Sequence, residues 1–187
     1  NLCAELIDGN IIRGETNIDI PLHNPTIPIK RIWLDPRANI NPNARKAILA
    51  ADMIVIGPGD LYTSLVPNLL VKGVATTIKK SKAKKVYVCN LMTKYGETHK
   101  FRAWDFVDKI EEYLGRGILD YAIFNKKKPP AHVLRRYRGE KAFFVDPRGL
   151  DFERRKPQII LADLLEPGRF IRHDPRKKLA KVLMGLM

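Results

Sequence analysis

Two polar loops that contain glycine each directly follow a short apolar run with the composition of a buried strand. The first loop is Gly57-Pro58-Gly59-Asp60-Leu61-Tyr62-Thr63-Ser64, after residues 53–56, and the second is Asn90-Leu91-Met92-Thr93-Lys94-Tyr95-Gly96-Glu97-Thr98, after residues 86–89. Glycine lets backbone N–H groups come close to a ligand, and a helix start adds its positive dipole end. Loops after consecutive parallel strands open at the same edge of a sheet, where α/β sheets bind ligands. The pattern therefore indicates a site for a phosphate-bearing ligand.

The first loop combines a tight turn with hydroxyl groups. Gly57 and Gly59 permit the turn, and Thr63 and Ser64 fall near the first turn of the helix expected to follow. These groups suit a cradle for a diphosphate. The alternative is a glycine turn that binds nothing, since short glycine motifs often arise by chance. No Gly-Lys-Ser/Thr sequence follows, which excludes a Walker loop.

The second loop carries amide, hydroxyl and carboxylate groups around Gly96. Asn90, at the strand exit, is able to bond a base, a sugar or the loop backbone, and Thr93 and Thr98 add donors and acceptors. Glu97 has two interpretations. It holds a sugar hydroxyl or acts as a general base, or it is the acidic residue favoured at the start of the next helix. The sequence leaves both open.

Alternating strands and helices are expected to position these loops. Residues 1–35 are β-rich, with a hairpin over 2–14, a loop or edge segment over 18–28 and a strand over 29–34. Residues 41–146 then alternate between short apolar strands and helices, which is typical of a parallel sheet covered on both faces. We expect strands over 53–56, 86–89, 121–124 and 142–145, and helices over 44–51, from 61 with an interruption at Pro67, and over 74–81, 102–114 and 129–138. Right-handed crossovers place the loops after the first three strands, with Asn125 in the third, along one rim.

A basic extension is expected over residues 147–187, ending in a helix over 175–187. The formal net charge is +14, and basic runs concentrate after residue 125. Nucleic acid, an anionic membrane surface, an anionic ligand or a plain basic surface would each explain this excess. The aromatic residues among these charges fall in or beside apolar runs, so we interpret them as core rather than as base-stacking groups: Tyr137, Phe143, Phe144, Phe152 and Phe170.

Other features limit the class of protein. No apolar run approaches the length of a membrane span. Cys3 and Cys89 have no metal-ligand spacing and are read as small buried thiols, which makes a reducing cytoplasm the expected location. The four histidines lack ligand spacing, and none has a partner placed for a catalytic triad. The chain begins at Asn1 in strand-like sequence without a signal, which reads as a fragment with part of the fold upstream.

The two loops and their flanks resemble one known family. The matching stretches are residues 56–64, Pro67-Asn68-Leu69-Leu70-Val71, residues 86–93, Gly96-Glu97-Thr98, and the opening Leu2-Cys3-Ala4-Glu5-Leu6 with Gly9 and Gly14-Glu15. Together they resemble the bacterial gluconeogenesis factor family, which is similar in turn to the archaeal 2-phospho-L-lactate transferases of coenzyme F420 synthesis. The resemblance runs from residue 1 to about residue 125, and the basic tail matches less clearly.

The resemblance implies a Rossmann-like α/β fold and a nucleotide-type ligand, such as UDP-N-acetylglucosamine in the bacterial proteins. In the archaeal enzymes it implies transfer of a phospholactyl group from a guanosine-linked donor to a deazaflavin alcohol. Carried onto this chain, the implied ligand contacts are Gly57, Gly59, Tyr62, Thr63, Ser64, Asn68, Asn90, Thr93, Glu97 and Thr98, with Asp60, Gly96 and Asn125 beside them. The resemblance also implies that the family's glycine-rich strand–loop–helix lies upstream of Asn1, so we expect half of the nucleotide site to be outside this sequence.

Three departures from the family pattern bear on chemistry. Asp60 stands where the family usually has Ser, and we expect its carboxylate to cap the next helix rather than face a phosphate. Phe106 follows Asp105 where the family often has Asp-His, which removes an imidazole. Lys94-Tyr95 replaces a polar-small pair and adds a positive charge. With a diphosphate, Asp60 and Asp105 together are candidate ligands for Mg²⁺.

Three functions remain. The first is a cytoplasmic, homo-oligomeric regulator of carbon metabolism and cell shape that binds a UDP-sugar and does no chemistry. The second is a phospholactyl-type transferase with a nucleotide-linked donor. The third is a nucleic-acid-binding protein that uses its basic tail. The intact Gly-Pro-Gly and Gly-Glu-Thr sequences favour the first, and no residue presents itself as a nucleophile or metal cage.

Overall fold

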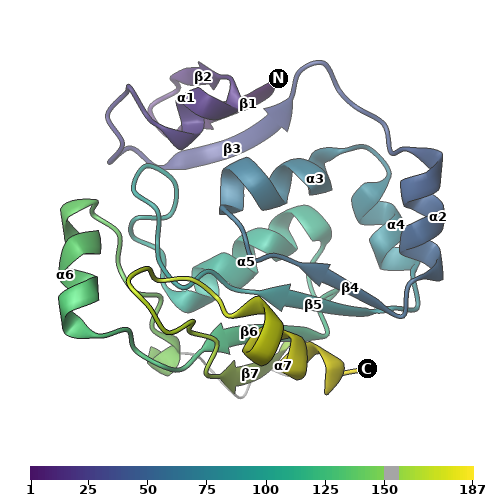
Figure 1. Cartoon of the computed structure of the whole chain (residues 1–187). Coiled ribbons are helices and arrows are strands. Elements are labelled where there is room, and N and C mark those ends of the chain that lie inside the picture. Colours follow the sequence, from purple (N-terminus) through teal and green to yellow (C-terminus); the bar gives the residue numbers. More distant parts are fainter. Residues whose placement is uncertain (150–155) are drawn as a thin grey trace.

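The computed structural model describes residues 1–149 and 156–187 and contains two β-sheets. A three-stranded antiparallel sheet has the order β2-β1-β3, and a four-stranded parallel sheet has the order β4-β5-β6-β7. Figure 1 shows α3 and α5 between the two sheets, with α7 on the far side of the parallel sheet. The expected α/β, Rossmann-like fold with a small β-rich amino-terminal segment is confirmed.

The small sheet is built from β1 (Leu2–Leu6), β2 (Ile11–Arg13) and β3 (Ile29–Leu34). β1 lies in the middle and pairs with both neighbours, so the expected hairpin is present. A short helix, α1 (Glu15–Asp19), follows β2 and was not among the elements expected from the sequence. Five residues are too few for a helical repeat of apolar positions to be recognised.

The parallel sheet contains β4 (Met53–Ile56), β5 (Lys84–Val88), β6 (Tyr121–Asn125) and β7 (Gln158–Ala162). The strand expected over residues 142–145 is wrong, because the fourth strand is β7, from the stretch expected to form a basic extension. Residues 142–145 instead attach to the second loop, where Val145 N–H donates to the Leu91 carbonyl and Thr93 N–H to the Phe143 carbonyl. An apolar run predicts an extended segment but not the partner it pairs with.

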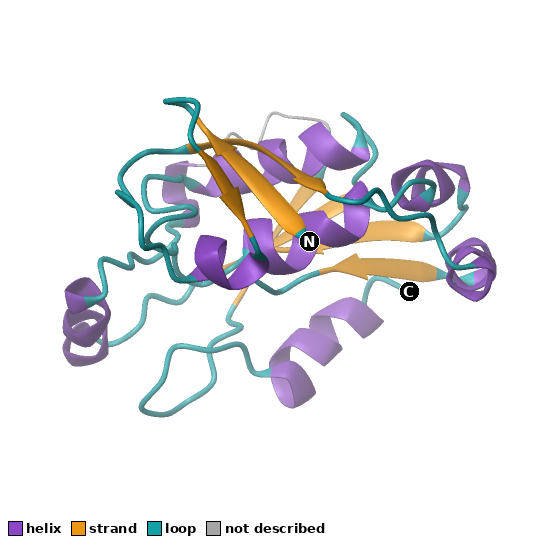
Figure 2. Cartoon of the chain, turned by 90° about the horizontal axis from the view of Figure 1, so that it is seen from above, coloured by secondary structure: helices purple, strands orange, loops and turns teal. Residues whose placement is uncertain are grey.

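Two layers of helices cover the parallel sheet. On one face lie α2 (Pro42–Ala50), a π-helical turn (Leu61–Leu65) continued by α3 (Val66–Leu70), α4 (Val74–Lys80) and α5 (Ala103–Leu114). On the other face lie a π-helical turn (Pro175–Leu179) and α7 (Ala180–Met184). Helix α6 (Ala131–Gly139) stands apart from the other helices (Figures 1 and 2).

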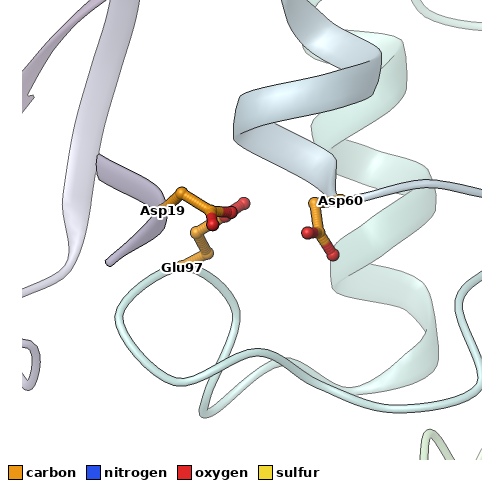
Figure 3. Close-up of side chains that lie close together, drawn as sticks. All are labelled: Asp19, Asp60 and Glu97. Atoms are coloured by element: carbon orange, nitrogen blue, oxygen red, sulfur yellow. The ribbon is translucent and has the colours of Figure 1, made fainter. Parts of the chain in front are cut away.

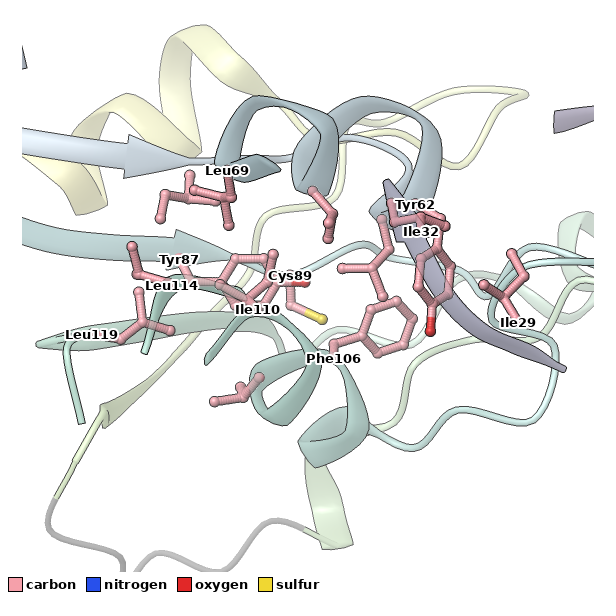
Figure 4. Close-up of a cluster of buried hydrophobic side chains, with 14 of the residues drawn as sticks. Ile29, Ile32, Tyr62, Leu69, Tyr87, Cys89, Phe106, Ile110, Leu114 and Leu119 are labelled. Atoms are coloured by element: carbon pink, nitrogen blue, oxygen red, sulfur yellow. The ribbon is translucent and has the colours of Figure 1, made fainter. Parts of the chain in front are cut away.

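Side-chain alternation along the strands creates two cores. Tyr87 and Cys89 face the larger cluster, where they join Phe106 and Ile110 of α5 (Figure 4). Val86 and Val88 point the other way and join the smaller cluster, which is completed by side chains after residue 160 and by the last helix. Residues that alternate in this way are the expected pattern for a sheet buried on both faces.

Pro67 does not interrupt the helix as expected. It lies in the first turn of α3, directly after the π-helical turn. At that position the missing N–H of proline costs no helical hydrogen bond. None of the helices in the described part of the chain has both the length and the apolar composition that a membrane span requires.

Candidate functional site

A cavity of about 770 Å³ lies where β4 and β5 end. The two loops that follow these strands form one side, and residues from α6 and from 171–175 form the other. Its lining residues are Pro58, Gly59, Asp60, Asn90, Leu91, Met92, Thr93, Lys94, Tyr95, Tyr137, Glu140, Ala142, Ile171, Arg172, His173 and Pro175. The carboxyl ends of parallel strands are the usual place for ligands in open α/β sheets.

Four of the residues predicted from the sequence line this cavity: Gly59, Asp60, Asn90 and Thr93. The Oδ1 atom of Asn90 is buried and has no hydrogen-bond partner among the described residues. Buried polar atoms are rarely left unpaired, so this amide is available to a ligand. Thr93 is more tightly held, since its hydroxyl accepts a 2.9 Å bond from Phe143 N–H.

Four other predicted residues are buried beside the cavity rather than in its lining: Tyr62, Thr63, Glu97 and Thr98. The carboxylate of Glu97 accepts 3.0 Å bonds from Tyr62 N–H and from the hydroxyl of Thr63. The Thr98 hydroxyl accepts a 2.9 Å bond from Lys94 N–H and so holds the second loop closed. Ser64 and Asn68 are exposed on the helix, where the Asn68 side chain donates to the Ser64 carbonyl.

The remaining predicted residues, Gly57, Gly96 and Asn125, contact other parts of the protein and do not line the cavity. Gly57 has φ +90°, and a side chain there would lie 2.7 Å from the carbonyl oxygen of Val88. Gly96 also has φ +90° and lies against Pro21. Asn125 is buried, and its Oδ1 accepts a 3.0 Å bond from Leu164 N–H. Asn125 therefore joins the end of β6 to the segment after β7.

The helix that starts at Leu61 is capped from a distance. Asp60 occupies the N-cap position, but its side chain makes no capping bond, so the expectation that it caps this helix is wrong. Glu97, from the second loop, bonds the free N–H of Tyr62 instead. Glu97 thus acts as an acidic residue at a helix start, as one of its two interpretations held. The helix is the one that begins at Leu61, however, and not α5, which follows Glu97 in the sequence. Burial raises the pKa of Glu97, and the nearby Lys94 ammonium opposes that rise.

Lys94 lies among three carboxylates. Its Nζ is 2.7 Å from Asp60 and 3.5 Å from Glu97, and it also contacts Asp19 of α1. Figure 3 shows the three carboxylates approaching one another from α1 and from the two loops. Partial burial disfavours the charged ammonium, but hydrogen bonds to Asp19 and Asp60 raise the pKa of Lys94 overall. Two of the three departures from the family pattern, Asp60 and Lys94, are therefore partners in one ion pair.

The expected magnesium pair is not formed. Asp105 accepts a 2.6 Å bond from Arg102 N–H at the start of α5 and lines a different cavity from Asp60. The oxygen atoms of Asp19, Asp60 and Glu97 lie within 4.8 Å of one another and have the chemistry that Mg²⁺ prefers. The Lys94 ammonium already supplies the positive charge of this cluster, so these residues do not fit a resident metal ion.

The sequence did not reveal the far wall of the cavity. Arg172 pairs with Glu166 at 3.3 Å, and His173 donates from Nε2 to the Cys89 carbonyl at 3.2 Å. Burial lowers the pKa of His173. The Tyr137 hydroxyl accepts a 3.0 Å bond from Ile171 N–H and fixes this wall. These residues lie far along the chain from the two loops, and no local motif marks them.

The aromatic residues of the tail are less buried than expected. Phe143 and Phe170 are 51% and 52% exposed, so the interpretation of these two as core is wrong. Tyr137 and Phe144 are half-buried, and Phe152 lies outside the described residues. Arg136 and Arg172 lie over the Phe170 ring, which explains how it stays at the surface. Of the basic run 154–156, only Lys156 is described, and it pairs with Asp120.

Known proteins match most of the chain. A family model described as 2-phospho-L-lactate transferase CofD matches residues 1–165. A protein of Thermotoga maritima named "Putative gluconeogenesis factor" is 42% identical over 189 residues, which cover 97% of this chain and 57% of that protein. The "Gluconeogenesis factor" of Bacillus subtilis is 37% identical and covers all of this chain.

A solved structure has the same architecture. The crystal structure of a UPF0052 family member from Bacillus halodurans is 35% identical and superposes with a TM-score of 0.88 over 98% of this chain. The match covers 58% of that protein. This chain thus spans somewhat less than three fifths of the length of the relatives that it matches.

Proposed function

We propose a function from the premise that this chain belongs to the 2-phospho-L-lactate transferase CofD family. The cavity at the ends of β4 and β5 binds a nucleotide diphosphate, and the ligand is a UDP-sugar such as UDP-N-acetylglucosamine. Binding regulates carbon metabolism and cell shape without chemistry at this site. The names of the bacterial relatives, which are gluconeogenesis factors, support a metabolic role.

The observation that carries this proposal is the meeting of the two loops at one cavity. Its volume of about 770 Å³ falls within the range of about 300–1,000 Å³ that is usual for ligand pockets. The Glu97–Tyr62 bond holds the loops side by side. Asn90 lines the cavity, and its buried Oδ1 has no hydrogen-bond partner among the described residues. A base or sugar with its own donors and acceptors would satisfy that amide.

The far wall supplies the other contacts of a nucleotide. Tyr137 of the far wall and Tyr95 of the second loop, on the opposite side, are the two tyrosine rings of the lining, and such rings stack on bases. Arg172 is the cation that we assign to the diphosphate, because a guanidinium binds phosphate oxygens in pairs. Lys94 contributes less, since its charge is already shared with Asp19 and Asp60.

Binding is favoured over catalysis because the acid–base groups near the cavity are engaged. Both oxygens of Glu97 accept hydrogen bonds at the start of the helix that begins at Leu61, and Asp60 pairs with Lys94. His173 uses Nε2 to bond the Cys89 carbonyl. A general base must be free to reach the proton that it removes. Both cysteines are free and buried, which supports a reducing, cytoplasmic setting.

A thermal-shift experiment on the full-length protein tests the proposal. UDP-N-acetylglucosamine should raise the melting temperature, because a ligand of the native state stabilises it. GDP and ADP serve as comparison nucleotides. Arg172→Ala should abolish the rise, and Arg148→Ala, an exposed arginine outside the cavity, is the matched control. The absence of a shift with every nucleotide would refute nucleotide binding altogether.

A second candidate is a phospholactyl-type transferase, which the description of the matching family model favours. The same cavity would then hold a lactyl-diphosphoguanosine donor. The hydroxyl of a deazaflavin alcohol would attack the phosphorus that bears the lactyl group, lose its proton, and break the diphosphate bond with release of GMP. Incubation of the full-length protein with both compounds distinguishes the two functions. Formation of the phospholactyl deazaflavin selects the transferase, whereas a melting shift with the UDP-sugar and no product selects the regulator.

A further inference from the structure

A second cavity, of about 390 Å³, lies away from the candidate site. It is bordered by β3, by the loop that follows β3, and by the end of α3. The side chains that matter in its lining are three cations and three apolar groups: Arg31, Arg37, Lys72, Trp33, Leu34 and Leu70. None of its lining residues is acidic, and none of them lines the first cavity.

The positive charge of this cavity is largely uncompensated. Arg37 and Lys72 are exposed and have no ion pair among the described residues. Arg31 bonds Glu5 through Nε at 2.6 Å, but Glu5 also takes a 2.7 Å bond from Lys30. One carboxylate thus serves two cations, and the rest of the Arg31 guanidinium stays available. A concave surface with charges of one sign concentrates ions of the opposite sign.

The cavity also has an aromatic wall. The Arg31 guanidinium lies over the Trp33 ring at 5.4 Å, which restrains both side chains. Leu34 and Leu70 add apolar surface beside the ring. Cations at the rim and an aromatic and apolar floor suit a ligand that has a phosphate group and a less polar body.

Backbone hydrogen bonds hold the rim in place. Ile40 N–H donates to the Lys72 carbonyl at 2.9 Å, and Lys72 N–H donates to the Ala38 carbonyl at 2.9 Å. These bonds join the loop after β3 to the end of α3, so Arg37 and Lys72 approach from two segments that are fixed to each other. A rim held in this way lowers the entropy cost of binding.

We propose that this cavity is a second binding site, for the phosphate groups of a small phosphorylated ligand. Arg31 and Arg37 offer planar donors that match phosphate oxygens, and Lys72 adds a point charge. The small volume of about 390 Å³ favours a small molecule over a nucleic-acid strand, which would need a groove that continues along the surface. The site does not depend on the function proposed for the first cavity.

Tryptophan fluorescence reports on this site directly. The chain has two tryptophans, Trp33 and Trp104, so Trp104→Phe leaves Trp33 as the only reporter. Pyrophosphate is the probe, and sodium chloride at the same ionic strength controls for screening. We expect a saturable change in Trp33 emission with pyrophosphate and none with chloride. In the double variant Arg37→Gln/Lys72→Gln, affinity should fall at least about tenfold.

Matched variants separate a site from general attraction to a basic protein. Arg135→Gln/Lys181→Gln removes the same two charges from exposed positions on α6 and α7, and should leave the affinity within about twofold. Arg172→Ala should leave the Trp33 response unchanged. The proposal is overturned if pyrophosphate gives no saturable response, or if both double variants weaken it equally. A response to single-stranded oligonucleotides without one to pyrophosphate would also overturn it, in favour of nucleic acid.

Discussion

The backbone N–H of Tyr62 donates a 3.0 Å hydrogen bond to the carboxylate of Glu97, which is 35 residues further along the chain. This bond caps the helix after the first loop and ties that loop to the second. The carboxylate is almost completely buried, with 3% of the residue exposed. One acidic residue therefore sets both the start of a helix and the distance between the two loops.

Glu97→Ala should lower the free energy of unfolding by about 2–4 kcal/mol, since each buried donor left unpaired costs about 1–3 kcal/mol. The donors in question are Tyr62 N–H and the Thr63 hydroxyl. Urea unfolding measures the change. Glu112→Ala, which removes an exposed carboxylate from α5, is the control and should cost less than about 1 kcal/mol. Equal losses in the two variants would contradict the capping role.

Asp60 and Lys94 should show strong coupling in a double-mutant cycle. Lys94→Gln leaves Asp19, Asp60 and Glu97 facing one another without their cation, and should destabilise the protein. Asp60→Ser in the same chain removes one of the carboxylates and should recover part of the loss. We expect a coupling energy of about 1–3 kcal/mol from urea unfolding of the four proteins. Additive effects would mean that the ion pair contributes nothing.

The two glycines of the first loop should differ in their tolerance of a side chain. Gly57→Ala should destabilise by about 2–4 kcal/mol, because φ is +90° and the new methyl group meets the Val88 carbonyl oxygen at 2.7 Å. Gly59→Ala should cost less than about 1 kcal/mol, since the nearest atom is the movable end of Leu65 at 3.1 Å. Thermal unfolding of both variants checks the order, which a reversal would refute.

That geometry also bears on Gly59→Val. A diphosphate cradle at the first loop predicts that this substitution blocks ligand binding with little effect on the fold. The new side chain would instead meet Ser64 and Leu65 on the helix. Binding measurements on this variant therefore need a parallel measurement of stability.

Stability should fall as the pH drops below about 6.5, partly through His173. Burial lowers the pKa of His173 below its ordinary value of 6.5. Between the two pKa values the unfolded chain binds a proton that the folded chain does not, so stability rises with pH and is complete above about 6.5. His173→Gln should flatten the part of this fall that lies below about pH 6.5, which urea unfolding at a series of pH values measures.

His132→Gln is the control for this measurement, because His132 is exposed on α6. Its pH profile should follow that of the wild-type protein. Identical profiles for the His173 variant and the wild type would show that His173 does not contribute.

The sequence predicted the parallel sheet because its strands are short apolar runs followed by glycine or amide residues. The runs at 53–56 and 121–124 correspond to β4 and β6, and the third overlaps β5. The run at 142–145 has the same local pattern but pairs with the second loop, and residues 158–162 take its place in the sheet. Local composition does not record which strand is the neighbour.

Only part of the candidate site was predictable, because local sequence patterns mark the two loops but not the residues that the folded tail brings to them. The placement of the two loops side by side followed from strand order, and the Glu97–Tyr62 bond agrees with it. Arg172 and His173 reach the cavity only through the folded path of the tail, which no nearby motif signals. The role of Lys94 also depended on three segments meeting, among them a helix too short to recognise.

The smaller core has a consequence for how the protein is made. Val86, Val88 and Ile123 are covered by Leu164, Leu179 and neighbouring apolar residues that the ribosome adds much later. During synthesis, one face of the parallel sheet therefore exposes its apolar side chains to water, while the helices that cover the other face have already been made. Until the tail has been made, the apolar side chains of that face stay exposed to water, and such exposure favours aggregation of the incomplete chain.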